Sequence, residues 1–290
     1  MANRRVLVKR RKSIRNIRKI TRTMQLIATA RFQAAYNRAV ASKPYTDKLA
    51  ELVADLSRAG ELDHPLLTTH NPDAPAALVV VTSHRGLCGG YNSSVLRAAQ
   101  GVLEERGKAA KPTRLHVFGK KGIAFFKFNR REMAEQNVSV SDAPRFEQVE
   151  PAGSALIADF LAGRVSSVHV AYMRFYSAGK QRPEVIQLLP MAKAESAPAG
   201  VKPKSVEYEF SPDPKLLLDQ LLPATVRARL FQAFIDAAVS EQVARMAAMK
   251  AATDASEDMI KNLTRQYNRA RQTAITMELL DIVGGANALA

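Results

Sequence analysis

Proline and glycine are absent between Ala224 and Val283. Both residues terminate helices, so this stretch of about 60 residues predicts one helix about 90 Å long at roughly 1.5 Å of rise per residue. A compact chain of this length has a radius of gyration of only about 19 Å. The helix must therefore project as a rod or pair with another long element, and this favours a shaft over an enzyme pocket.

Other shortages narrow the class of protein. Cys88 is the one cysteine, which excludes an internal disulfide and fits a reducing compartment. The longest apolar run, Ala76 to Val81, is far shorter than the roughly 18 residues of a membrane-spanning helix. The basic N-terminus is not followed by the apolar segment of a secretory signal, although its composition also resembles a mitochondrial transit peptide.

Acidic residues are missing from the start of the chain, where the first is Asp47. The formal net charge is +16, and many of the basic residues precede that aspartate: Arg4, Arg5, Lys9, Arg10, Arg11, Lys12, Arg15, Arg18, Lys19, Arg22, Arg31, Arg38 and Lys43. A basic helix suits a nucleic acid, an anionic membrane or an acidic protein surface, and it is also typical of the solvated face of a coiled coil. Only Phe32 and Tyr36 could stack on bases, and no nucleic-acid-binding motif is present.

Two segments at opposite ends of the chain have the apolar periodicity of paired long helices. Near the C-terminus a three-four alternation predicts the seam of a coiled coil, with small or flexible residues at most positions: Met246, Met249, Thr253, Ser256, Ile260, Leu263, Tyr267, Ala270, Ala274 and Met277. Near the N-terminus we expect the matching face at Ile17, Ile20, Met24, Ile27 and Ala34. Pro44 is expected to interrupt this helix before Tyr45, Leu49, Leu52 and Leu56 resume the pattern. An ordinary helical bundle is the alternative to an antiparallel coiled coil.

The middle of the chain alternates predicted strands with predicted helices, which indicates a mostly parallel sheet. Strands are expected at residues 76–82, 114–118, 167–176 and 184–189, and helices at 92–106, 121–128 and 148–161. We therefore expect three regions: residues 1–60 as an N-terminal coiled-coil helix, 61–211 as a central α/β domain, and 212–290 as a C-terminal coiled-coil helix.

The glycine-rich turn at residues 85–92 (RGLCGGYN) follows a predicted strand and precedes a predicted helix, where phosphates often bind. It lacks both the P-loop and the dinucleotide-binding spacing, so a purely structural turn is favoured over a phosphate site. A nucleotide-using α/β enzyme stays open as an alternative, as does a thiol nucleophile at Cys88 beside His84. The five histidines have no metal-ligand spacing, and no catalytic pair of acids is evident.

Four segments resemble the gamma subunit of F-type, proton-translocating ATP synthases of the bacterial type. They are residues 13–31 (SIRNIRKITRTMQLIATAR), the glycine turn, residues 240–254 (SEQVARMAAMKAATD) and residues 263–286 (LTRQYNRARQTAITMELLDIVGGA). The resemblance extends from about Val8 to Leu289. Because it begins close to Met1, it leaves little room for a transit peptide.

The resemblance implies a fold and a role. The expected fold is an antiparallel coiled coil of the N- and C-terminal helices with a central, Rossmann-like α/β domain. The expected role is that of the central rotor stalk, a non-catalytic subunit that couples rotation of the membrane c ring to ATP synthesis in the alpha/beta ring. The implied partners are the alpha, beta and epsilon subunits and the c ring, without nucleic acid, metal or cofactor. The implied location is peripheral, on the cytoplasmic face of the bacterial inner membrane and through the complex only.

The resemblance also implies particular interface residues. Met24, Arg245, Gln272, Thr276 and Glu278 match family positions at the interface with the catalytic ring. Tyr208, Glu209 and Phe210 are the candidates for contact between the foot of the stalk and the c ring. The chain differs from the usual family residues at His84, Ser211, Met277 and Asp281. Since a polar side chain on a solitary coiled coil is expected to be exposed, we predict that Arg245, Gln272 and Glu278 contribute little to stability.

Overall fold

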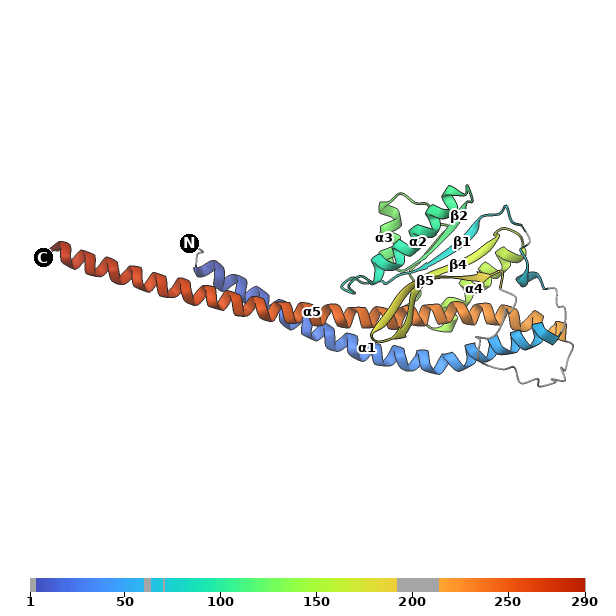
Figure 1. Ribbon diagram of the computed structural model, residues 1–290, viewed down its shortest axis with the longest axis horizontal. Helices are drawn as coiled ribbons and strands as arrows, with labels where there is room; N and C mark the ends of the chain where they lie inside the picture. The colour runs from blue at the N-terminus through green and yellow to red at the C-terminus, as the bar shows by residue number, and fades with distance from the viewer. Residues whose placement is uncertain (1–3, 60–63, 70, 192–213, 290) are drawn as a thin grey trace. The chain divides into compact units, whose positions relative to one another are not determined.

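The computed structural model describes residues 4–59, 64–69, 71–191 and 214–289 (Figure 1). The chain divides into two compact units, which are considered separately below. One consists of residues 31–244, and the other combines residues 1–30 with residues 245–290. Both long helices, α1 (Arg4–Ala59) and α5 (Pro214–Leu289), contribute to each unit.

A five-stranded sheet organises the unit of residues 31–244. Its strands are β1 (Ala76–Val81), β2 (Thr113–Phe118), β3 (Glu135–Asn137), β4 (Ser167–Ser177) and β5 (Lys180–Leu189). The strand order is β3-β2-β1-β4-β5, with β5 antiparallel to β4 and the other pairs parallel. The predicted α/β class and its strands are confirmed, while the short β3 was not anticipated.

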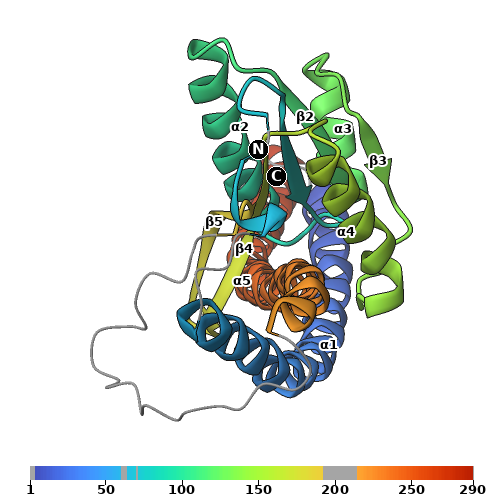
Figure 2. The same ribbon diagram turned by 90° about the vertical axis from the view of Figure 1, so that its right-hand side faces the viewer.

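Helices cover both faces of this sheet (Figure 2). The helices α2 (Tyr91–Lys108) and α3 (Lys120–Phe128) bury one face around Leu78, Val95 and Phe126. On the other face, α4 (Phe146–Leu161) and the first part of α5 pack in a core that includes Val79 and Phe160. The sheet is therefore buried on both sides, which explains why β1 is an uninterrupted apolar run with every residue buried.

The long helices extend further than the sequence indicated. The expectation that Pro44 interrupts α1 is wrong, because the helix continues through it to Ala59. The C-terminal helix begins at Pro214, within the region of residues 212–290 expected for it, and continues through Pro223 ahead of the stretch without proline or glycine. Proline removes one intrahelical hydrogen bond and strains the preceding turn, typically at a cost of about 3 kcal/mol. Packing offsets this in the unit of residues 31–244, where α1 buries Ala35 and Ala39 in a cluster with Ile235 and Val239 of α5.

The unit of residues 1–30 and 245–290 is an antiparallel helix pair. The Thr253 hydroxyl oxygen lies 2.8 Å from that of Thr21, and the Arg11 guanidinium lies 5.1 Å from the ring centre of Tyr267. Positions later in α5 therefore face positions earlier in α1. On α5 the predicted seam is buried or half-buried from Met246 to Ala274, so its periodicity is confirmed over that range.

The seam of α1 in this unit differs from the prediction. Its buried or half-buried positions are Leu7, Arg11, Ile14, Arg18, Thr21, Met24, Gln25 and Ala28, and of the seam residues predicted within this unit only Met24 is among them. Three predicted seam residues, Ile17, Ile20 and Ile27, are instead exposed by 45 to 59%. The prediction selected large aliphatic residues, whereas the observed seam combines Leu7 and Ile14 with small and polar residues such as Thr21 and Ala28.

Candidate functional site

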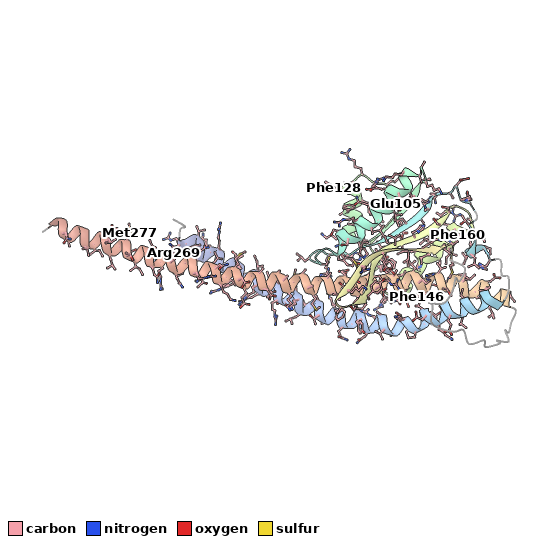
Figure 3. The ribbon with its side chains drawn as sticks, in the orientation of Figure 1. Glu105, Phe128, Phe146, Phe160, Arg269 and Met277 are labelled. Atoms are coloured by element: carbon pink, nitrogen blue, oxygen red, sulfur yellow. The ribbon has the colours of Figure 1, made fainter. Side chains whose placement is uncertain are left out.

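The last turns of α5 expose large apolar side chains on nearly all sides. Ile275, Met277, Leu279, Leu280, Ile282 and Val283 are each 47 to 68% exposed. At about 100° per residue, these positions surround the helix axis instead of forming one stripe. Met277, which the sequence placed in the seam, is thus exposed, and it lies with Arg269 along this part of the helix (Figure 3). Continuous exposed apolar surface of this kind is typical of a segment that a partner encloses.

Three predicted interface residues lie on this same part of α5. Gln272, Thr276 and Glu278 are all exposed. The Thr276 hydroxyl donates a hydrogen bond of 3.0 Å to the backbone carbonyl of Gln272, one turn earlier. Gln272 and Thr276 are about 40° apart around the helix, whereas Glu278 lies about 160° from Thr276. The structure therefore brings the first two residues together and places Glu278 on a different face.

The remaining predicted residues have different environments. Met24 on α1 is half-buried. Arg245 on α5 is only 6% exposed, so the expectation that this side chain is exposed is wrong. Arg245 precedes the buried seam residue Met249 by four positions, so the two side chains lie on the same face of α5. Tyr208, Glu209, Phe210 and Ser211 lie outside the described residues.

The glycine turn is held by its own side chains. Asn92 accepts a 3.0 Å hydrogen bond from the Ser83 amide and donates one of 2.8 Å to the Ser83 hydroxyl. Leu87 and Gly89 both have positive φ angles, 62° and 55°. Cys88 is buried, only 2% exposed. These contacts fit the structural interpretation of the turn, in which asparagine and glycine close a sharp bend between β1 and α2.

A second loop is fastened beside the first. The Thr82 hydroxyl donates to the Phe118 carbonyl at 2.8 Å and accepts from the Gly122 amide at 2.9 Å. Gly119 has φ 98°, and a Cβ atom at this residue would lie 2.1 Å from the Thr82 carbonyl oxygen. Only glycine allows the ends of β1 and β2 to approach so closely.

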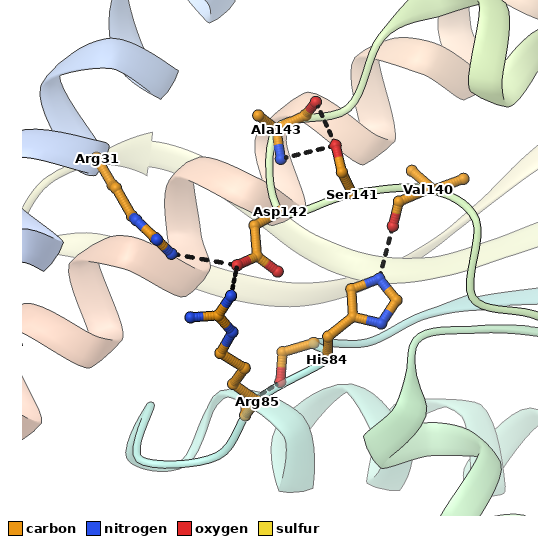
Figure 4. Close-up of polar contacts among 8 residues, drawn as sticks. Arg31, His84, Arg85, Val140, Ser141, Asp142 and Ala143 are labelled. Carbon is orange, nitrogen blue, oxygen red and sulfur yellow. Dashed lines mark hydrogen bonds and ion pairs between the residues drawn. The ribbon is translucent and has the colours of Figure 1, made fainter.

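A basic cleft lies next to these loops in the unit of residues 31–244. Asp142 accepts from Arg31 at 3.2 Å and lies 3.6 Å from Arg85 (Figure 4). The cleft encloses about 610 Å³, and its lining also includes Arg38 and Lys120, so basic side chains outnumber the one acidic group. The imidazole Nε2 of His84 is 2.6 Å from the Val140 carbonyl oxygen, which attaches the glycine turn to the loop that carries Asp142.

The sequence contained no local signal for this cleft. Arg31 and Asp142 are 111 positions apart, and Asp142 lies in a loop without regular spacing to any other acid. Only the high density of basic residues near the N-terminus pointed toward an acidic partner. Arg31 is one of those N-terminal basic residues, and the fold brings Arg85 close to it in the cleft.

Hydrogen bonding and burial define the surroundings of three histidines in this unit. The His116 Nδ1 atom lies 3.1 Å from Glu135, and this hydrogen bond lowers the pKa of the carboxyl below its usual value. Burial is the largest influence on His64 and His169 and lowers the pKa of each. Within the part of the chain that the structure describes, there is no group of three or more histidine, cysteine or acidic residues that could hold a metal ion. No helix among the described residues is long and apolar enough to cross a membrane.

Comparison with known proteins covers the whole chain. Residues 3–289 match the family model described as ATP synthase. The ATP synthase gamma chain of Rhodopirellula baltica is 42% identical over 294 residues, covering 100% of this chain and 99% of the relative. That of Frankia casuarinae is also 42% identical, covering 97% of this chain and 96% of the relative.

A solved structure has the same fold at much lower identity. The Euglena gracilis mitochondrial ATP synthase rotor contains a chain that aligns with a TM-score of 0.63 at 14% identity, covering 94% of this chain and 98% of that one. At this identity the likeness concerns the fold alone. The family model and the full-length relatives confirm the resemblance found in the sequence: the chain belongs to the ATP synthase gamma chain family.

Proposed function

We propose that this chain is the central rotor stalk of an F-type ATP synthase, a non-catalytic subunit that couples rotation of a membrane c ring to ATP synthesis in an alpha/beta ring. The observation that carries this proposal is full-length identity of 42% to ATP synthase gamma chains, together with a helix end that is apolar on nearly all sides. A solitary protein gains nothing from such a surface, whereas a shaft enclosed by a ring of subunits requires it.

The shaft acts by presenting different side chains to each surrounding subunit. A ligand or partner shifts a conformational equilibrium only as far as it binds the two states differently. Gln272 and Thr276 lie on one face of α5 and Glu278 on another, so a ring subunit meets a different set of donors and acceptors at each rotary angle. Met24 and Arg245 support this interface from the helix pair.

The basic cleft extends the proposal to the α/β unit. We assign it to acidic segments of the alpha/beta ring, because Arg31, Arg85 and Lys120 surround a single carboxylate. Exposed ion pairs each contribute little, about 0 to 1 kcal/mol, but they orient an encounter between partners. The foot, with Tyr208, Glu209 and Phe210, meets the c ring, and the epsilon subunit binds the same α/β region.

Location and domain roles follow from this assignment. The chain sits peripherally at the cytoplasmic face of a bacterial inner membrane and is held there through the complex. Residues 1–60 and 212–290 supply the shaft, and residues 61–211 supply the foot. The family membership favours this function over the two other classes that the sequence left open, a basic nucleic-acid-binding coiled coil and a nucleotide-using enzyme.

Reconstitution with the partner subunits of the same organism tests the function. The chain should assemble with the alpha and beta subunits and restore rotation-coupled ATP hydrolysis. A variant with serine at both Leu280 and Val283 should weaken assembly, because each exposed side chain then buries less apolar surface in the ring. The matched control changes Val138, which is 52% exposed on the α/β unit, to serine.

Two results would contradict the proposal. One is a stable alpha/beta complex with full coupled activity in the absence of this chain. The other is identical assembly of the tip variant and the control, since the apolar tip would then have no partner. High-affinity binding of ATP to the isolated chain would support the enzyme alternative instead.

A further inference from the structure

A cavity of about 560 Å³ lies within the unit of residues 31–244, away from the glycine turn and the basic cleft. Three elements form its walls: α1 with Tyr36 and Val40, the β4-β5 pair with Tyr172 and Ile186, and α5 with Arg229. This volume falls in the usual range for small-molecule sites, about 300 to 1,000 Å³. Nothing in the proposed rotor mechanism uses it.

Two polar groups in the cavity have no hydrogen-bonding partner among the described residues. Tyr172 is 4% exposed and lines the cavity, yet its hydroxyl makes no hydrogen bond within the described ranges of the chain. Burial raises the pKa of this hydroxyl to about 12, so it remains a neutral donor at physiological pH. Arg229 is partly buried, and its guanidinium likewise makes no hydrogen bond or ion pair with any described residue. Both groups line the cavity, so the pair is available to an acceptor that enters it.

Two neighbouring charged side chains already have hydrogen-bonding partners. Arg174 donates to Glu184 at 3.1 Å and lies 5.2 Å from the ring centre of Tyr176. Asp236 accepts a hydrogen bond of 2.9 Å from the Gln232 side chain. Burial is the main cause that lowers the pKa of Arg229, and the nearby positive charge of Arg174 lowers it further. The guanidinium nevertheless stays protonated. Asp236 also lines the cavity, and because its pKa is raised only to about 6, it is ionised at physiological pH. The lining therefore sets the basic side chains of Lys43, Arg174 and Arg229 against the acidic side chains of Asp47 and Asp236.

Apolar and aromatic side chains form much of the remaining lining, together with the polar Thr46, Thr225 and Gln232. Tyr36 and Phe175 meet edge to face with ring centres 6.0 Å apart, and Ile186, Met191 and Leu67 contribute aliphatic surface. At the lining positions Lys43 and Asp47 both side chains are exposed, which places charged groups where α1 meets solvent. The cavity therefore combines a donor-rich position at Arg229 and Tyr172 with apolar and aromatic surface beside it.

We propose that this cavity binds a small amphipathic carboxylate, whose carboxylate group is held by Arg229 and the Tyr172 hydroxyl and whose apolar body packs between Tyr36, Phe175 and Ile186. A planar guanidinium pairs with a carboxylate through two parallel hydrogen bonds, which makes arginine selective for this group. Because α1 and α5 both line the cavity, the ligand would link these helices within the α/β unit.

Calorimetric titration of the full chain with 4-phenylbutyrate tests the site. This probe has about 12 nonhydrogen atoms, and we expect a dissociation constant below about 1 mM. Its neutral analogue, 4-phenylbutyramide, should bind at least about tenfold more weakly, because it cannot pair with the guanidinium. Arg229→Gln should weaken binding of the acid by about tenfold or more, and Tyr172→Phe by about three- to tenfold.

A control variant outside the cavity tests whether the effects are specific to its lining. Arg114→Gln removes an exposed arginine on β2 outside the cavity and should leave affinity within about twofold of the unmodified chain. If Arg229→Gln fails to fold, Tyr172→Phe and the acid-amide comparison still decide the question. The proposal is wrong if the acid does not bind at about 10 mM, which is weaker than any useful ligand site. It is also wrong if acid and amide bind equally, or if both cavity variants bind the acid as the unmodified chain does.

Discussion

Replacing Gly119 with alanine should destabilise the α/β unit strongly. Gly119 precedes α3 with φ 98° and ψ 140°, a conformation that side chains disfavour, and the strain costs about 1 to 3 kcal/mol. The added Cβ would also lie 2.1 Å from the carbonyl oxygen and 2.7 Å from the carbonyl carbon of Thr82. Backbone atoms cannot rotate away, so overpacking adds about 1 to 3 kcal/mol. The sum, about 2 to 6 kcal/mol, is a large share of the 5 to 15 kcal/mol that stabilises a typical domain.

Two other glycines provide matched controls. At Gly101 on α2 an added Cβ would meet no atom within 4 Å, so Gly101→Ala should stabilise the helix by about 0.5 to 1 kcal/mol. At Gly122 the Cβ would lie 2.7 Å from the Thr82 hydroxyl oxygen and 2.9 Å from a methyl group of Val117. Side chains can shift more readily than backbone, so Gly122→Ala should have an intermediate effect.

Hydrogen exchange of the full chain in increasing urea measures the series, read from peptides that contain β1 and β2. The expected order of stability is Gly101→Ala, unmodified chain, Gly122→Ala, Gly119→Ala. A Gly119→Ala variant within about 1 kcal/mol of the unmodified chain would refute the argument, because strain and overpacking together exceed that value.

Three further predictions concern function, pH and reactivity. Gln272→Ala and Glu278→Ala should preserve assembly but slow ATP turnover of the reconstituted complex by a factor corresponding to about 1 to 3 kcal/mol; unchanged steady-state hydrolysis in both would remove these residues from the mechanism. Burial raises the pKa of Asp236 to about 6, so the folded state holds a proton that the unfolded state releases near pH 4. Stability should therefore fall as pH rises from about 4 to 6, and Asp236→Asn should flatten this part of the urea-denaturation profile by about 2 to 3 kcal/mol; an unaltered profile would contradict it. Cys88 is buried, so iodoacetamide should modify it at least about 100-fold more slowly in the native chain than in urea, as mass spectrometry can follow, and comparable rates would show that the glycine turn opens readily.

The elements of the α/β unit were predictable because their signals are local. Ala76 to Val81 is an uninterrupted apolar run, and a strand buried on both faces needs that composition. The glycine turn also followed from local chemistry, since positive φ angles at Leu87 and Gly89 belong to a sharp bend. By contrast, β3 has three half-buried or exposed polar residues and no periodicity, so only its pairing with β2 defines it as a strand.

The candidate sites were predictable only where they follow one helix. Gln272, Thr276 and Glu278 could be placed on an exposed helix end because helix geometry fixes relative directions along a single segment. The basic cleft and the cavity lined by Tyr172 and Arg229 could not be predicted, since each combines side chains of α1 with side chains far along the chain. Arg245 shows the same difficulty: its charge indicated exposure, but its place beside the seam decides its burial.

The incorrect seam on α1 carries a mechanistic consequence. Hydrophobic periodicity selects Ile17, Ile20 and Ile27, yet the helix pair buries Thr21 and Ala28 at the same level of the helix and leaves the isoleucines exposed. Small residues allow two helices to approach closely, but they bury little apolar surface and so stabilise the pair weakly. The larger apolar side chains then remain available for a surrounding partner, as they do on α5 at Ile282 and Val283. A shaft of this kind is stabilised by the surrounding subunits as well as by its own seam. Its exposed apolar face is the surface that those subunits contact as the shaft rotates. Stronger hydrogen-exchange protection of residues 257–283 in the assembled complex than in the free chain is the expected result, and equal protection in both states would contradict this division of the surface.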